Sequence, residues 1–164
     1  MKRNFTNIFT LLLLLFICSC KFSTGIKKDL STGLTSVNNG LSAEDIFLKE
    51  YEGNRLPNNK VKLGNKISLS ASGVENFELK NGKVYPGCQI ILTDKNKKEV
   101  INLPDAFADM VNGSTEDETN TLNATLTTGD PMVVGETYHL YVRFFDKQKK
   151  ESEIVSNVDI LMIQ

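Results

Sequence analysis

Several short stretches of this chain carry an apolar residue at every second position, and this spacing constrains the fold more than any other feature. The alternation is found in four stretches: residues 61–71, 88–93, 122–126 and 138–145. Successive side chains of a strand point to opposite faces, so a period of two is typical of a strand with one buried face. Residues 45–49 read either as a short helix, with Ser42 as its cap and Asp45 three residues on, or as a first strand, which we favour. A last strand is expected within residues 154–163.

Turn signals separate these strands about every eight to twelve residues. Asn81-Gly82 suits a two-residue hairpin because both positions tolerate positive φ, and Pro86-Gly87 should interrupt the return strand. Gly64-Asn65 predicts a bulge or a tight bend within a single strand. About seven or eight short strands with little helix predict an all-β fold, a two-sheet antiparallel β-sandwich. The strand spacing is similar to that of immunoglobulin-like and transthyretin-like sandwiches.

The N-terminus has the charged, apolar and small-residue order of a secretory signal. Lys2 and Arg3 precede an apolar run that ends in Ile17-Cys18-Ser19-Cys20. This junction resembles the bacterial lipobox, in which an aliphatic residue and then a small residue precede a cysteine that becomes lipidated. The resemblance covers only the leader. It implies a bacterial lipoprotein with a signal peptide over residues 1–19 and a covalent lipid on Cys20.

The same resemblance implies a location in the bacterial cell envelope. An Asp after the lipidated cysteine tends to signal retention in the inner membrane, and Lys21 stands there instead, which favours the outer membrane, on its periplasmic or surface side. Residues 20–40 are mainly Ser, Thr, Gly, Asn and Lys. We therefore expect a lipidated N-terminus and flexible tether over residues 20–40, with a reach of roughly 25 Å. The β-sandwich domain is expected over residues 41–164.

Charge and composition exclude several classes of function. The 19 basic and 20 acidic residues become 17 and 20 once Lys2 and Arg3 are removed, a net charge of about −3, so nucleic acid is not an expected partner. His139 is the only histidine, and the chain has no Gly-x-Ser-x-Gly motif and no Cys/His metal spacing. We expect a protein that is not an enzyme and has no cofactor besides its lipid. Cys88 shares the parity of Ile90, which predicts a buried thiol.

A seventeen-residue segment, 104–120, is longer than most loops in compact domains and is rich in acids. Three of these acids are the candidates for a calcium site: Asp105, Asp109 and Glu116. The Asp-x-Asp-x-Asp-Gly order of a preformed calcium loop is absent, so we expect no metal and solvated carboxylates. In this interpretation Pro104 begins a short helix, and Phe107 and Met110 pack against a sheet edge.

The strand over residues 138–145 provides the candidate binding face. Its apolar side faces the core, and its other side has four candidate binding residues: His139, Tyr141, Arg143 and Phe145. Aromatic rings with a guanidinium are enriched at protein interfaces and also stack on sugars. The structural alternative is that the tether or the 104–120 loop covers this face, or that Arg143 shields the rings.

These features favour a membrane-anchored envelope lipoprotein whose sandwich docks a protein partner, as the accessory of an envelope assembly. The alternative is a surface lipoprotein that binds a carbohydrate or a host molecule on the candidate face. A hydrolase that uses only loop carboxylates is the third hypothesis.

Overall fold

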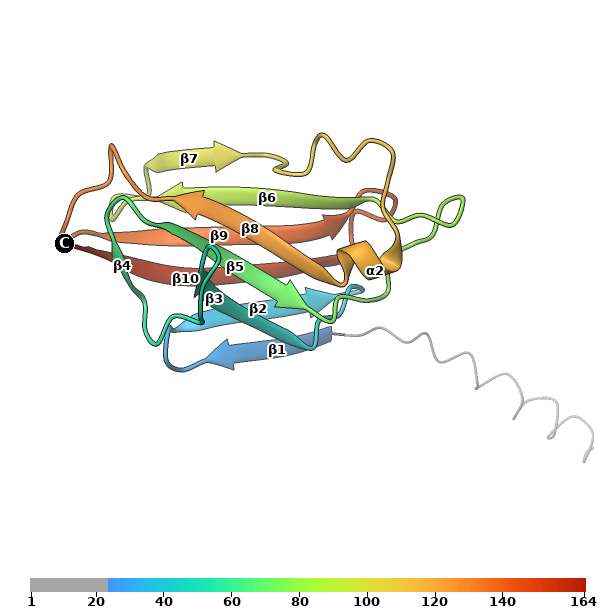
Figure 1. The fold of residues 1–164 in the computed structure, drawn as a ribbon, viewed down its shortest axis with the longest axis horizontal. Coiled ribbons are helices and arrows are strands. Elements are labelled where there is room, and N and C mark those ends of the chain that lie inside the picture. Colours follow the sequence, from blue (N-terminus) through green and yellow to red (C-terminus); the bar gives the residue numbers. More distant parts are fainter. Residues whose placement is uncertain (1–23) are drawn as a thin grey trace, which may run out of the picture.

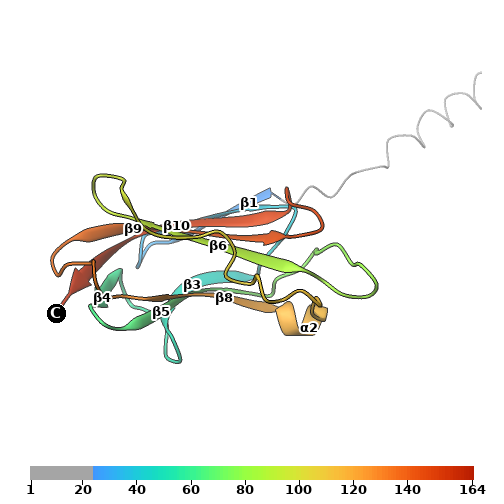
Figure 2. The same cartoon turned by 90° about the horizontal axis from the view of Figure 1, so that it is seen from above.

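The computed structural model describes residues 24–164, which form two mainly antiparallel sheets packed face to face (Figure 1). Figure 2 shows the two layers edge-on. The expected signal peptide and Cys20 lie outside the described residues. The all-β sandwich predicted from the alternation is confirmed, with ten strands in place of the expected seven or eight.

The larger sheet has seven strands. Six of them follow in the order β1 (Thr24–Asp29), β2 (Leu34–Asn39), β10 (Glu153–Ile163), β9 (Thr137–Asp146), β6 (Pro86–Thr93) and β7 (Glu99–Leu103). The seventh, β4 (Lys60–Lys62), runs parallel to the end of β10. The smaller sheet consists of β3 (Asp45–Glu50), β5 (Lys66–Ser72) and β8 (Thr121–Thr127), in that order. The predicted strand at residues 45–49 is thus confirmed as β3.

The core lies between the two sheets and is built by the alternation read from the sequence. In β9, Leu140, Val142 and Phe144 are buried, and they face Ile67 and Leu69 of β5 across the core. Burying a side chain of this size stabilises the fold by about 2 kcal/mol relative to leaving it in water. The thiol of Cys88 is also wholly buried in this core, as its parity predicts.

Residues 24–39 are part of the folded domain, which corrects the tether expected over residues 20–40. They form the hairpin of β1 and β2, and β2 pairs along β10. The inward residues of β2 are Leu34, Ser36 and Asn38, all buried. Ser36 Oγ lies 2.8 Å from Ser156 Oγ of β10, so each hydroxyl finds a partner. Polar residues on the buried side hid the alternation, and pairing with a distant strand overrode the local composition.

The single strand expected over residues 61–71 is wrong, because its two halves lie in different sheets. Val61 belongs to β4 of the larger sheet, and Leu69 belongs to β5 of the smaller sheet. Between them Gly64 adopts a φ of 94°, which is open to glycine and costly for other residues. The glycine therefore marks a tight bend, as expected, but one at which the chain crosses between the layers and not a bulge within one strand.

Two local expectations also need correction, while the Asn81-Gly82 turn is confirmed. Both of its residues have positive φ, at 55° and 72°, although only an isolated bridge between Lys80 and Lys83 flanks it. Pro86-Gly87 begins β6 and does not interrupt it. The short helix expected to begin at Pro104 is instead α2 (Glu116–Thr119). Its start is fixed by a capping box that Thr115 and Glu118 form.

Candidate functional site

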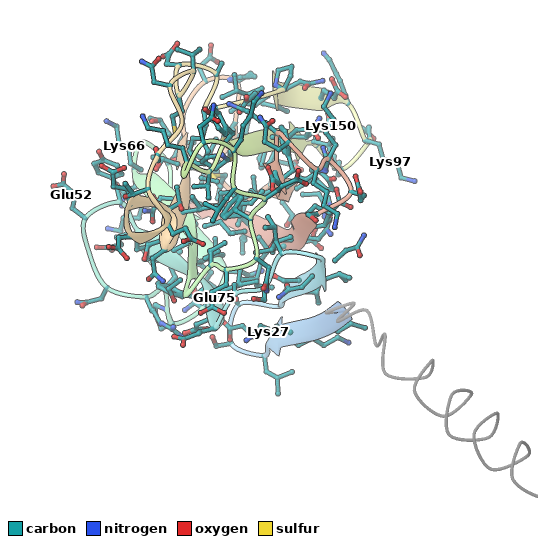
Figure 3. All side chains as sticks on the ribbon, turned by 90° about the vertical axis from the view of Figure 1, so that its right-hand side faces the viewer. Lys27, Glu52, Lys66, Glu75, Lys97 and Lys150 are labelled. Carbon is teal, nitrogen blue, oxygen red and sulfur yellow. The ribbon has the colours of Figure 1, made fainter. Side chains whose placement is uncertain are left out.

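The four candidate residues lie on the outer face of the larger sheet, the face turned away from the core. Their strand, β9, is in the middle of that sheet, between β10 and β6. Figure 3 views the sandwich end-on, with Lys97 and Lys150 on the side of the larger sheet and Lys66 on the side of the smaller sheet. The structure brings the four residues together on one strand, and their neighbours on β10 and β6 determine how much of each is accessible.

Both ring nitrogens of His139 are engaged by β10. Nδ1 lies 2.8 Å from Oδ1 of Asp159, and Nε2 lies 3.1 Å from Oδ1 of Asn157. Asp159 is the residue directly opposite His139 in the register of the two strands. The imidazole is exposed but is held flat along the sheet by two partners, so a ligand that bonds to it must compete with them.

Arg143 covers Phe145, as the structural alternative anticipated. Its guanidinium lies 4.6 Å from the centre of the Phe145 ring, pairs with the Glu153 carboxylate, and donates to the carbonyl of Lys150 at 2.8 Å. Beneath the ring is Gly87 of β6, where an added Cβ would lie only 2.2 Å from a ring atom. The Phe145 side chain is therefore enclosed between glycine and guanidinium, and it offers no free ring for stacking.

Of the two benzene rings among the four residues, that of Tyr141 remains accessible. It is half-buried, and this burial raises the pKa of its phenol, opposed by the nearby Arg143 charge. In the sheet register Tyr141 stands opposite Ile91 of β6, and Val155 of β10 is its diagonal neighbour. Val155 in turn stands opposite Val37 of β2, which is 43 % exposed. We call these four residues, Val37, Ile91, Tyr141 and Val155, the apolar patch.

Sequence reasoning missed three residues of the apolar patch. Val37 was assigned to the tether, and Ile91 and Val155 are isolated aliphatics on the polar side of their strands. The available signal was the alternation of Val37 with Ser36 and Asn38, a strand pattern in which the buried side is polar.

A cavity of about 550 Å³ adjoins the candidate face at the β6–β7 turn. Its lining consists of Thr93, Asp94, Lys95, Lys97, Thr137, His139 and Asp159. At its rim the Lys95 ammonium lies 3.0 Å from the Glu136 carboxylate, and this hydrogen bond raises the pKa of Lys95. The volume falls in the range of small-molecule sites, and its lining is rich in hydroxyl and charged groups.

The acidic loop places its three candidate residues in different roles. Asp105 accepts from the backbone N–H of Cys88 at 3.0 Å and of Phe107 at 2.9 Å, and its other oxygen lies 2.9 Å from Lys147 Nζ. Burial raises the pKa of Asp105, but these hydrogen bonds together with the Lys147 charge outweigh it and lower the pKa. Asp109 is exposed in the loop, and Glu116 is exposed at the first position of α2. Within residues 24–164, no group of three or more His, Cys, Asp or Glu side chains is arranged to hold a metal ion.

The Cys88 thiol has no role at the surface. Burial raises the pKa of Cys88 to about 12, and the neighbouring Asp105 charge adds to the effect. Because the thiolate is the reactive form, this thiol is chemically inert at neutral pH.

No protein-family model and no curated protein matches this chain. Among the residues that the structure describes, no helix is long and apolar enough to cross a membrane. The chemistry of the chain's own residues is therefore the basis for a function.

Proposed function

We propose that this protein is a non-enzymatic lipoprotein of the bacterial envelope, anchored in the outer membrane by lipid on Cys20, whose sandwich docks a protein partner. The partner binds the outer face of the larger sheet, centred on the apolar patch. One observation carries the proposal. The apolar patch spans β2, β10, β9 and β6, and the second sheet covers only the opposite face of these strands.

The chemistry of this face supports docking of a protein. A patch of aliphatic side chains beside a tyrosine, with Arg143 and Glu153 at its margin, has the composition of a protein interface: an apolar centre and a charged rim. Tyrosine is also among the residues that most often dominate binding energy.

Site-specific photo-crosslinking in cells tests the proposal on the lipidated full-length chain. A crosslinking residue at Tyr141 should give an adduct of one discrete size, and the same residue at Thr125, on the outer face of the smaller sheet, should not. Val37→Asp should reduce the Tyr141 adduct several-fold, whereas Thr121→Asp should leave it unchanged. Equal adducts from positions 141 and 125, or none from either, would contradict docking on this face.

The cavity beside His139 favours a second candidate function, a surface lipoprotein that binds a carbohydrate. Thr, Asp, Lys and His side chains from the β6–β7 turn, β9 and β10 line this cavity. The enclosed Phe145 ring cannot stack on a sugar, so recognition would rest on hydrogen bonds. If this function is correct, the mature protein binds to a glycan array. The double variant His139→Ala with Lys97→Glu should lose this binding, and the control variant Thr125→Ala should keep it.

A further inference from the structure

The outer strand β1 lies next to the proposed lipid anchor. We propose that β1 and the turn that follows it rest on the bilayer surface, so that the sandwich stands on this edge of its larger sheet. This inference depends on the lipidation of Cys20 that the proposed function assumes. It goes beyond that function by identifying which part of the domain faces the lipid.

The first step is covalent reach. Four residue steps separate Cys20 from Thr24, where β1 begins, and a fully extended chain covers at most about 14 Å over that number of steps. The opposite edge of the sheet, β7, is five strand spacings away, about 24 Å further at roughly 4.8 Å per spacing. The anchor therefore brings the β1 edge to the bilayer before any other edge. A tether over residues 20–40 would have left the orientation open.

The second step is the chemistry of that edge. Ile26 is 71 % exposed, and Leu30, in the turn after β1, is 93 % exposed, the most exposed large apolar side chain among the described residues. Lys28, between them in the sequence, is also exposed. Apolar side chains interleaved with lysine are the combination that binds an anionic membrane surface, since the former enter the acyl boundary and the latter approach the phosphates.

The third step limits the depth of contact. Among residues 24–164, β1 pairs only with β2, and no described strand pairs with the backbone groups along its other edge. Such groups are costly in hydrocarbon but are readily hydrated among headgroups. In Figure 3 β1 lies at the margin of the molecule, with Lys27 beside it. Contact is therefore at the headgroup level, with only the side chains of Ile26 and Leu30 reaching deeper.

The chain contains no Trp, so a single introduced Trp reports its own surroundings. Leu30→Trp and Val111→Trp are matched probes, because both positions are highly exposed and Val111, 73 % exposed, lies beyond β7 at the other edge. Each lipidated full-length variant is placed in vesicles of phosphatidylethanolamine and phosphatidylglycerol with brominated acyl chains. We expect Trp emission at position 30 to shift to the blue and to be quenched several-fold more than emission at position 111.

Two results would overturn the inference while leaving the anchor intact. They are equal quenching at both positions, and no quenching at position 30 in protein that floats with the vesicles and carries lipid on Cys20 by mass spectrometry. Protein that lacks the lipid and does not float with the vesicles would instead overturn the proposed anchor, and the inference with it. A blue shift at position 30 without quenching would show that a protein surface covers β1, which also overturns the inference.

Discussion

The outer face of the larger sheet carries the aliphatic side chains of the apolar patch beside Tyr141, whereas on the outer face of the smaller sheet β5 and β8 carry mainly short hydroxyl and amide side chains. On that smaller sheet β3 adds Phe47, which lies beneath the Arg55 guanidinium. On the smaller sheet Ser68 Oγ lies 2.9 Å from Thr125 Oγ1, and Ser70 donates to Asn123 Oδ1 at 2.6 Å. These pairs stand directly opposite each other in the register of β5 and β8. Neighbours on β5 and β8 therefore satisfy each other's polar groups on this face.

Long side chains that lie over a ring and pair by charge occur on both outer faces. On the larger sheet Arg143 lies over Phe145 and His139 lies beside Asp159. On the smaller sheet Arg55 lies over Phe47 and pairs with Asp45. Long side chains cover the middle of β9 but leave the shorter aliphatics of the apolar patch in contact with water. The two faces therefore differ in the accessible aliphatic side chains of the apolar patch and not in the presence of covering ion pairs.

The largest expected effect tests the enclosure of Phe145. Gly87→Ala places a methyl group where the ring now lies, at 2.2 Å, so the ring and the guanidinium above it must move. Overpacking of this kind costs about 3 kcal/mol, which urea denaturation measures directly. Gly25→Ala in β1 is the control, since an added Cβ there meets no atom within 4 Å. Similar midpoints for the two variants would show that the face has no fixed packing.

A smaller effect on stability depends on pH and tests the charge of Asp105. Asp105 is tied to β6 of the larger sheet through the Cys88 N–H, and Asp105→Asn should cost about 2 kcal/mol at neutral pH, because a charge-assisted set of bonds is weakened. The folded pKa of Asp105 lies below its unfolded value of 3.8. Its stabilisation is therefore complete above that value and is lost as the pH falls through the folded pKa.

Urea denaturation between about pH 5 and pH 2 checks this window. The free-energy difference between the parent and Asp105→Asn should shrink toward the acid end. Asp109→Asn, in the same loop but exposed, should follow the parent throughout. A difference that stays constant with pH would mean that the Asp105 charge contributes nothing to stability.

How far the sequence predicts this fold depends on whether the buried side of each strand is apolar. The alternation in β8 and β9 identified both strands and their buried sides, because there the buried residues are apolar. It failed in β2, where Ser36 and Asn38 are buried, and at Gly64, where the alternation continues across a change of sheet. The alternation of apolar residues shows which side of a strand is buried, but not which sheet the strand belongs to.

The candidate site was predicted only in part for a related reason. The sequence placed His139, Tyr141, Arg143 and Phe145 on one face, and the structure agrees that they share it. Their accessibility depends on residues opposite them, such as Gly87 and Asp159, which long-range pairing supplies. The sequence of β9 alone contains no information on those partners, so it could not separate the accessible Tyr141 from the enclosed Phe145.

The smallest expected effects lie on the smaller sheet and come from one hydrogen bond. Asn123→Ala leaves the buried Ser70 hydroxyl without its acceptor and should cost about 1.5 kcal/mol, whereas Ser70→Ala leaves an exposed amide that water can satisfy and should cost about 0.5 kcal/mol. The asymmetry should not change between about pH 5 and pH 2, because neither group ionises. Denaturation of the two single variants and the double variant measures it. If Ser70→Ala cost more than Asn123→Ala, the Ser70 hydroxyl would have a second hydrogen-bond partner. The outer face of the smaller sheet would then depend on more than the pairwise bonds between β5 and β8.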